Sequence, residues 1–385
     1  MEAEAYESTP FGAARRTGGA HGYVAYFPAP IPRGLDLPRG TVRLLADAEG
    51  ALGVLAGVGS LLPNPELLIQ PYLIREALSS TRIEGTQASL VEVLESDASG
   101  EPPNADVEEV VNYVLAMRIG LERLRELPLS TRLLREMHRI LMTGVRGKDL
   151  SPGELRTTQN WIGPAGSTIE SAPFVPPPPE EMAALLTDWE RFANEESELP
   201  LLIQDALLHA QFETIHPFLD GNGRLGRLMI VFFLVAKGKL TAPLLYLSTY
   251  IETHRVEYYA ALQAIREGGD PVPWLELFLT AVLTQAEDAV TRSRRILELR
   301  ERYRESAGAM SSPNALGLVD LLCSNPIVTT RAVEEELDVS RPTALRLLRT
   351  MEKIGILTES GQGARGQRRY VATEMMAAVT GGSDE

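Results

Sequence analysis

Twelve consecutive residues, His216 to Arg227, constrain this chain more than any other feature; they read HPFLDGNGRLGR. Two glycines flank Asn222, so the backbone there can adopt conformations that other residues avoid and can approach a ligand closely. The apolar run 225–235 follows directly and predicts a buried helix. A glycine turn at the start of a helix directs free N–H groups and the positive end of the helix dipole at one point. The stretch therefore predicts an anion-binding site.

The charged side chains of the same stretch fit such a site. Arg224 and Arg227 lie three residues apart on the first helical turn, so both can reach one polyphosphate. Asp220 places a carboxylate beside the anion site, where a bridging cation, usually Mg²⁺, would connect it to phosphate. His216 supplies a group that can accept a proton near pH 7. The stretch also contains a G-x-G-x-x-G pattern, but the helical period of 201–215 excludes the preceding strand that a dinucleotide fold requires.

The stretch resembles the H-P-F-x-D-G-N-G-R-x-x-R motif of the Fic (Fido) family and matches every fixed position. The resemblance implies a helical core with a β-hairpin flap; with an N-terminal helical region and a C-terminal winged helix expected from the segments described below, the fold class is mostly α. It also implies transfer of AMP from ATP to a Ser, Thr or Tyr hydroxyl of a target protein, the chain itself included. His216 would be the general base toward that hydroxyl, and Asp220 would bind Mg²⁺. The implied ATP contacts are Gly221, Asn222, Gly223, Arg224, Leu225, Gly226 and Arg227, with Arg227 at the γ-phosphate.

Two residues outside the motif are added to the expected nucleotide site. Glu213 lies one helical turn before His216 and is expected on the pocket side, although a plain charge on the helix surface fits equally well. The resemblance places the later helix 255–266 beside the adenine base. Tyr259 is favoured as the contact there, because an aromatic ring can flank a base. Half-buried packing of the pair Tyr258 and Tyr259 is the alternative.

A second informative stretch is STRIEG at 80–85, which ends a predicted helix over about 72–84. Ser80 and Glu84 are four residues apart and face the same way. A helix C-terminus disfavours an anion by roughly 0.3–1 kcal/mol, so Glu84 is either a solvated frayed end or a carboxylate held by a cation. The stretch resembles the family's inhibitory motif, [S/T]-x-x-x-E-[G/N]. That resemblance implies that Glu84 pairs with Arg227 and keeps the γ-phosphate of ATP from docking productively.

Three further segments carry expectations of their own. The segment 152–179 joins short apolar runs, broken by glycines, to four consecutive prolines, which favours a β-hairpin over an ordinary surface loop. It resembles the Fic flap, which adds the backbone of the target as an extra strand. His138 lies among apolar residues and is expected to be a packed structural histidine. Residues 1–40 are rich in Pro and Gly and are expected to be extended surface chain or partly disordered.

The end of the chain has a different pattern. Three short amphipathic segments and a hairpin around a glycine-rich turn at 361–366 resemble a winged helix-turn-helix, with 340–350 as its recognition helix. The basic residues that could meet DNA phosphates are Arg341, Arg346, Arg349, Arg365, Arg368 and Arg369. The acidic residues of 334–338 nearly cancel that charge. DNA binding is therefore weighed against protein contact or dimerisation, which leaves a homodimer as an open expectation.

The chain of 385 residues has room for several domains. The expected division is an N-terminal helical region with the inhibitory helix (1–126), a Fic-like catalytic core (127–291), a helical linker (292–310) and a winged helix-turn-helix (311–376). The net charge of −15 argues against general steering toward nucleic acid or anionic membranes. The single Cys323 excludes an internal disulfide framework and fits a reducing cytoplasm. No run of 18 apolar residues is found, so no membrane segment is expected.

Two other functions remain open beside AMP transfer. The same site could remove AMP from a modified target, with Glu84 orienting water instead of blocking ATP. A regulator that binds DNA could instead use the ATP pocket as a sensor. The intact His216 favours an enzyme, because a pure sensor needs no base. Transfer of phosphate is disfavoured, because the Gly-Asn-Gly nest is intact.

Overall fold

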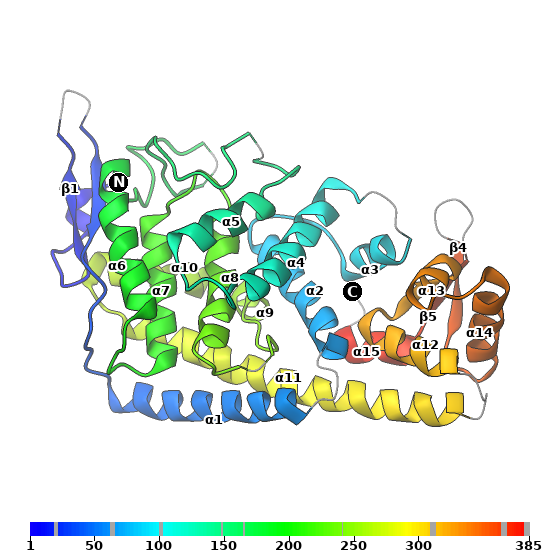
Figure 1. Ribbon diagram of the computed structural model, residues 1–385. Helices are drawn as coiled ribbons and strands as arrows, with labels where there is room; N and C mark the ends of the chain where they lie inside the picture. The colour runs from blue at the N-terminus through cyan, green and yellow to red at the C-terminus, as the bar shows by residue number, and fades with distance from the viewer. Residues whose placement is uncertain are drawn as a thin grey trace.

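The computed structural model describes residues 1–18, 22–61, 66–99, 103–147, 149–164, 166–240, 242–308, 313–362 and 368–380. The predicted mostly helical fold is confirmed (Figure 1). The N-terminal region contains β1 (Gly12–Arg16), β2 (Val24–Pro28), α1 (Arg39–Leu61), α2 (Glu66–Ile83), α3 (Leu90–Ser99) and α4 (Ala105–Arg123). Then follow α5 (Thr131–Leu141), α6 (Met182–Asn194), α7 (Leu201–Ile215), α8 (Asn222–Ala236), α9 (Ser248–Thr253), α10 (Arg255–Gly268) and α11 (Val272–Gly308). The chain ends with α12 (Pro313–Ser324), β3 (Ile327–Thr329), α13 (Thr330–Glu336), α14 (Arg341–Lys353), β4 (Thr358–Gln362), β5 (Arg368–Val371) and α15 (Thr373–Thr380).

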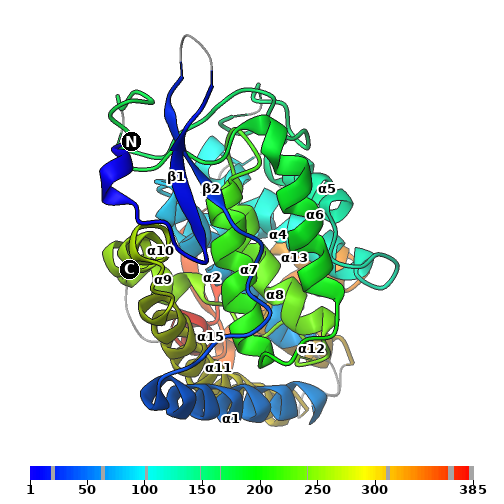
Figure 2. The same cartoon turned by 90° about the vertical axis from the view of Figure 1, so that its left-hand side faces the viewer.

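Helices α7 and α8 form the centre of the core (Figure 2). Both helices are buried nearly all around, because their sequences are almost continuously apolar. Two tryptophans hold α7 from opposite neighbours. The indole N–H of Trp189 on α6 donates to the Leu208 carbonyl at 2.9 Å, and that of Trp274 on α11 donates to the Ala206 carbonyl at 2.8 Å. Helix α7, which leads into the turn before α8, is thereby held in the centre of the core.

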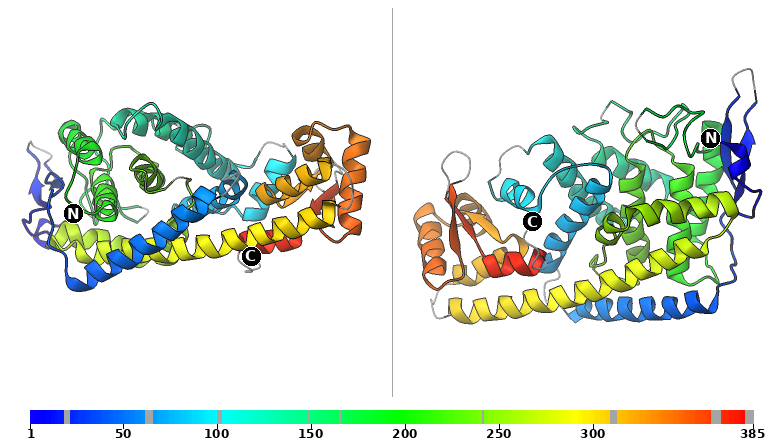
Figure 3. Two further views of the ribbon diagram at one scale, coloured as in Figure 1. Left: turned by 60° about the horizontal axis from the view of Figure 1, so that its bottom comes forward. Right: turned by 180° about the vertical axis from the view of Figure 1, so that it is seen from behind.

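Helix α11 extends from the core to the C-terminal module as one element of 37 residues. The sequence predicted a closing helix and then a charged connector; the structure joins them without a break. Helix α1 lies alongside α11 beneath the core, as Figures 1 and 3 show. None of the helices in the described ranges offers an apolar stretch long enough to cross a bilayer.

The expectation of irregular surface chain at the N-terminus is wrong for 12–16 and 24–28, which form paired strands, whereas 29–38 contains no helix or strand. Strands β1 and β2 pair in antiparallel register, with Ala14 opposite Tyr26. The ring of Tyr26 is 1% exposed and lies 5.9 Å from the ring of Phe174 in the flap segment. The Tyr26 N–H donates to the Val175 carbonyl at 2.9 Å. Two short strands gain stability here by packing against the flap, which a local Pro and Gly count does not reveal.

The flap segment itself is less regular than a hairpin. Its described residues contain one antiparallel bridge, between Ile162 and Phe174, instead of a ladder of paired residues. Arg156 fixes the base of the segment, because its guanidinium donates to the backbone carbonyls of Pro177, Ile215 and His216. The flap is therefore tied to the end of α7 through one buried arginine.

The C-terminal module has the element order α12, β3, α13, α14, β4, β5, and its three strands form an antiparallel sheet in the order β3-β5-β4. The Thr329 side chain accepts from the Ala332 N–H and caps α13, whereas Ser340 occupies the N-cap position of α14 without a side-chain cap bond. Strand β3 is additional to the predicted hairpin. Residues 363–367, which contain most of the glycine-rich turn and Arg365, lie outside the described residues.

The close contact between α4 and α8 gives a test of the packing. A Cβ added to Gly120 on α4 would lie 1.9 Å from Phe232 Cζ on α8. We expect Gly120→Ala to lower the free energy of unfolding by about 1–3 kcal/mol, because overpacking exceeds the gain in helix propensity. Gly53→Ala on α1 is the matched control, because a Cβ there meets nothing within 4 Å. Chemical denaturation of the two variants should separate them, and equal stability would contradict the packing.

Candidate active site

The predicted base, His216, lies at the turn that joins α7 to the glycine stretch. It caps α7 in the left-handed conformation, with φ 49° and ψ 61°, and its N–H donates to the Phe212 carbonyl. Burial and, to a smaller extent, the positive charges of Arg266 and Arg156 together lower the pKa of the imidazole to about 3. The imidazole is therefore neutral near pH 7 and free to accept a proton.

Two side chains shape the loop that follows His216. The amide of Asn222 closes the loop on itself: its Oδ1 accepts from the Phe218 N–H at 2.9 Å and its Nδ2 donates to the Phe218 carbonyl at 2.8 Å. His138 supports the loop from α5, stacked on the Phe218 ring with centroids 3.9 Å apart. Its Nδ1 accepts from the Gly153 N–H at 2.8 Å, so Nε2 carries the proton that bonds the Asp220 carbonyl at 2.9 Å. His138 is thus the packed histidine that the sequence predicted.

The anion site itself is the first turn of α8. Its N-cap is Gly221, with φ 76°, so no side chain caps the helix and its first N–H groups can meet an anion. The next two glycines make room for carboxylates. A Cβ on Gly223 would lie 2.4 Å from Oε1 of Glu84, and one on Gly226 would lie 2.6 Å from Oε1 of Glu213. The glycine spacing of the motif thus admits two acidic side chains from other parts of the chain.

Arg227 and the inhibitory stretch meet at this site, 143 residues apart in sequence. The Arg227 guanidinium is 2% exposed, and its Nη2 lies 2.9 Å from Oε1 of Glu84. Ser80 takes two further bonds: its Oγ accepts from Nε at 3.0 Å and its carbonyl accepts from Nη2 at 2.8 Å. Desolvation opposes ionisation of both partners, yet their mutual attraction outweighs it, which lowers the pKa of Glu84 and raises that of Arg227. Nε and Nη2 of Arg227 are therefore both bonded to the stretch that contains Ser80 and Glu84.

The guanidinium of Arg224, unlike that of Arg227, lies beside Glu109 and Asp220. Its side chain is 4% exposed, with Nη1 3.4 Å from Oε2 of Glu109 on α4 and Nη2 3.8 Å from Oδ1 of Asp220. Its Nε is buried and has no hydrogen-bond partner among the described residues. An unpartnered buried donor of this kind is costly, and an incoming phosphate oxygen would satisfy it. No motif indicated Glu109, because a single glutamate on a helix has no signature in sequence.

Asp220 offers a single carboxylate to a metal ion. Its side chain is 40% exposed, and its Oδ1 accepts from the Gly221 N–H at 2.6 Å. No group of three or more His, Cys, Asp or Glu side chains that could enclose a metal occurs within the described ranges. A single carboxylate beside an anion site still fits Mg²⁺, which usually takes one or two protein carboxylates, substrate phosphates and waters.

The two residues added to the nucleotide site differ in exposure. Glu213 is buried, so it is not a plain surface charge; its Oε2 lies 3.9 Å from Nδ1 of His216. Burial raises the pKa of Glu213 to about 7, against the positive charge of Arg227. Tyr258 is the packed member of the tyrosine pair, with its hydroxyl 2.9 Å from Nε2 of His209, whereas Tyr259 is 43% exposed. Tyr259 is therefore the ring of the two that a ligand can reach.

Comparisons with known proteins agree with this geometry. Residues 42–122 match the family model described as Fic/DOC family N-terminal, and residues 128–234 match the model described as Fic/DOC family. The chain is 28% identical over 251 residues to protein adenylyltransferase Fic of Drosophila erecta, covering 61% of this chain and 47% of that protein. The Drosophila grimshawi protein of the same name is 30% identical over 198 residues, covering 49% and 37%. The chain thus spans half or less of the length of these curated relatives.

The fold is also similar to solved structures. A Fic family protein from Desulfovibrio desulfuricans G20 superposes with a TM-score of 0.57 at 20% identity, covering 88% of this chain and 97% of that one. A Fic domain containing signaling protein from Bacteroides thetaiotaomicron gives a TM-score of 0.51 at 20% identity, covering 66% and 97%. At these identities the likeness concerns the fold alone, and it extends over most of the chain.

Proposed function

Because residues 42–122 and 128–234 of this chain belong to the Fic/DOC family, we propose that it is a protein adenylyltransferase. It would transfer AMP from ATP to a Ser, Thr or Tyr hydroxyl of a target protein, the chain itself included. The observation that carries the proposal is the joint placement of a neutral buried imidazole, His216, and an uncapped helix start, α8, on one loop. The names of the similar Drosophila proteins support the same reaction class.

The proposed step is an in-line displacement at the α-phosphorus of ATP. His216 takes the proton of the target hydroxyl as its oxygen bonds the α-phosphorus, and the bond from that phosphorus to the oxygen bridging to the β-phosphate breaks. Pyrophosphate leaves with the electron pair. Asn222 and Gly223 would offer backbone N–H groups to the phosphates, and Arg224 its unpartnered Nε, whereas the Gly221 N–H bonds Asp220 in this structure. Asp220 would hold Mg²⁺, which neutralises phosphate charge.

The same geometry supports autoinhibition by Glu84. The γ-phosphate and the Glu84 carboxylate are both anions that suit the Arg227 guanidinium, and a guanidinium makes one bidentate pair at a time. In the arrangement described, Ser80 and Glu84 occupy it. ATP in a productive pose would therefore have to displace Glu84. Removal of AMP, with Glu84 orienting water, is the alternative that uses the same atoms.

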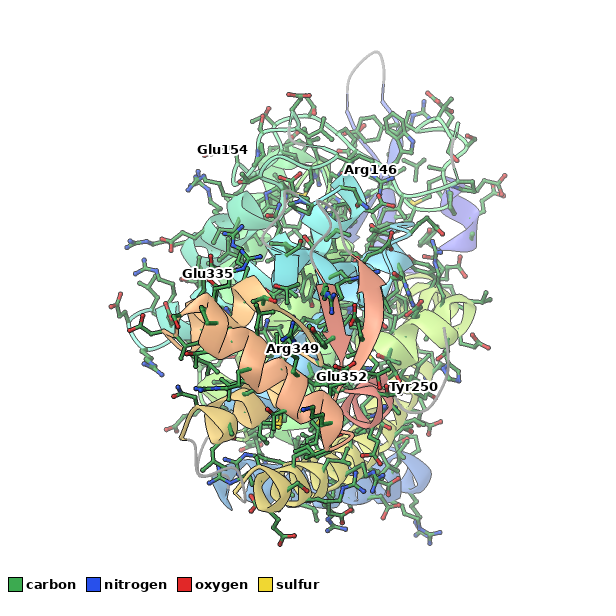
Figure 4. The ribbon with its side chains drawn as sticks, turned by 90° about the vertical axis from the view of Figure 1, so that its right-hand side faces the viewer. Arg146, Glu154, Tyr250, Glu335, Arg349 and Glu352 are labelled. Carbon is green, nitrogen blue, oxygen red and sulfur yellow. The ribbon has the colours of Figure 1, made fainter. Side chains whose placement is uncertain are left out.

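The C-terminal module is proposed to be a winged helix-turn-helix that binds DNA. Helix α14 would be the recognition helix, and it exposes Arg346, Arg349 and Lys353 at i, i+3 and i+7 on one face; Figure 4 shows Arg349 and Glu352 on the outward side of this helix. Two other expected phosphate contacts are paired within the chain. Arg368 lies 3.3 Å from Glu359, and Arg369 pairs with Glu95.

The reaction class can be tested with labelled ATP. We expect the protein, incubated with a lysate, to incorporate label from the α-phosphate and none from the γ-phosphate. His216→Ala should abolish incorporation and leave ATP affinity within about twofold, because the base acts on the acceptor and not on the phosphates. His138→Gln would not test the base, because His138 holds the loop that follows His216 through its bond to the Asp220 carbonyl. Retained γ-label, or undiminished transfer by His216→Ala, would refute the proposed reaction.

Autoinhibition has its own test in a double variant. Glu84→Gly should raise incorporation of α-label by at least about tenfold, because it frees Arg227 for the γ-phosphate. Arg227→Ala should abolish incorporation, and Glu84→Gly should fail to rescue it. Glu92→Gln on α3 is a control carboxylate whose partner is Ser89, away from Arg227. Unchanged activity of Glu84→Gly would show that the Glu84–Arg227 pair is structural only.

DNA binding is measurable on the whole chain by gel shift. We expect duplex DNA to bind at low salt and to dissociate as salt rises, because phosphate contacts release counterions. Arg346→Glu with Arg349→Glu should abolish the shift. Arg331→Glu is the matched control, because that exposed arginine on α13 is paired with Glu335. The absence of a shift at low salt would leave protein contact as the role of the module.

A further inference from the structure

A buried carboxylate on α4, Glu109, joins two parts of the site that the motifs treat separately. Glu109 is 3% exposed. Its Oε2 accepts a hydrogen bond from the Thr86 hydroxyl at 2.6 Å and lies 3.4 Å from Nη1 of Arg224. Its Oε1 lies 3.7 Å from Nη2 of Arg146. Thr86 follows Glu84 by two residues, so one carboxylate contacts both the inhibitory stretch and an arginine of the motif.

The inhibitory stretch beyond α2 is a turn closed mainly on itself. The N–H groups of Glu84 and Thr86 both donate to the Thr81 carbonyl, at 3.0 Å and 3.2 Å, and Gly85 adopts φ 100°. These local bonds set the shape of the turn but not its position against α8. That position is set directly by the bonds of Ser80 and Glu84 to Arg227, and from the α4 side by two contacts: Thr86 to Glu109, and the Gln87 N–H to Asp106 Oδ2 at 3.0 Å. Of these two contacts the one to Glu109 is buried and the one to Asp106 is exposed, so the first is the stronger.

The same carboxylate is the nearer and more deeply buried of the two that face Arg224, the other being Asp220. A buried guanidinium without a counter-charge is strongly destabilising. Glu109 supplies such a charge from α4 at Nη1, while Nε of Arg224 has no hydrogen-bond partner among the described residues. The guanidinium is thereby oriented before any phosphate arrives.

We propose that Glu109 is a positioning residue that clamps the inhibitory turn through Thr86 and orients Arg224 for the phosphates. The clamp keeps Glu84 on Arg227, so α4 sets the strength of the inhibition. This inference rests on the proposed function, because it concerns the same site. Glu109 thus has two effects, one on the inhibitory turn and one on Arg224, and a different variant measures each of them.

The clamp is tested with Thr86→Val, which removes the hydroxyl and nearly preserves the volume. We expect α-label incorporation without added activator to rise about tenfold, because Glu84 is held less firmly. Thr81→Val is the matched control: Thr81 is also buried in the turn, but its hydroxyl bonds its own helix at Ala77 and Leu78. Its activity should stay within about twofold of the parent. Equal activity of the two variants would overturn the clamp.

Measurements in Glu84→Gly protein distinguish a failure of the clamp from a failure of the proposed function. In Glu84→Gly protein, Thr86→Val should give no further increase, since the residue that it positions is absent; an additive increase would overturn the clamp. If Glu84→Gly protein shows no transfer at all, the proposed function fails. If it is active while Thr86→Val alone behaves like Thr81→Val, the proposed function stands and the clamp fails.

The second effect is read from ATP kinetics in the Glu84→Gly background. Glu109→Gln should raise KM for ATP several-fold with a smaller change in kcat, because Arg224 loses its orientation. Thr86→Val should leave KM unchanged there. Glu108→Gln, the neighbouring half-exposed carboxylate, is the control for a charge change on α4. An unchanged KM for folded Glu109→Gln would overturn the orientation of Arg224, and circular dichroism establishes that the variant is folded.

Discussion

The site depends on one buried guanidinium and the groups that neutralise it. Arg227 is inside the core, and a charge in that position is tolerated only when hydrogen bonds and a counter-charge surround it. Ser80 and Glu84 supply both in the absence of a ligand. These bonds hold the end of α2 against the start of α8. They thereby also position the helical region that precedes the core. The contact between Glu84 and Arg227 is thus a packing contact, whatever its effect on ATP, which explains how a partly exposed glutamate can hold a defined place.

Much of the site could be predicted because its parts are adjacent in sequence. The motif from His216 to Arg227 is a single loop and helix start, so local geometry brings the base, the glycine nest and the arginines together. The pairing of Glu84 with Arg227 was predicted from a resemblance, since no local rule joins residues so far apart. Glu109 was missed for the same reason: on α4 it has the appearance of a solvated charge until tertiary packing buries it. The ambiguity over Glu213 was likewise a question of burial.

The fold, like the site, was predictable where the residues that determine it are close together in sequence. Long apolar periods predicted the core helices, and the side chains of Ser130 and Thr329 cap α5 and α13 at their first turns. The strands β1 and β2 were missed because their stability comes from Phe174 and Val175, which lie about 150 residues later in the chain. The predicted hairpin in the flap reduces to a single bridge, because Arg156 and β2 supply contacts that a free hairpin would otherwise make with itself.

Helix α11 has a mechanical consequence. A continuous helix of 37 residues is a strut of about 55 Å, and an uninterrupted backbone ladder leaves no hinge along its length. It begins at Val272, is bonded to α7 through Trp274, and reaches the C-terminal module. The module is also fastened to α3, where Asn325 bonds Asp97 and Thr329 bonds the Ala98 carbonyl. The distance between the C-terminal module and the loop that follows His216 is therefore set by the length of one rigid helix.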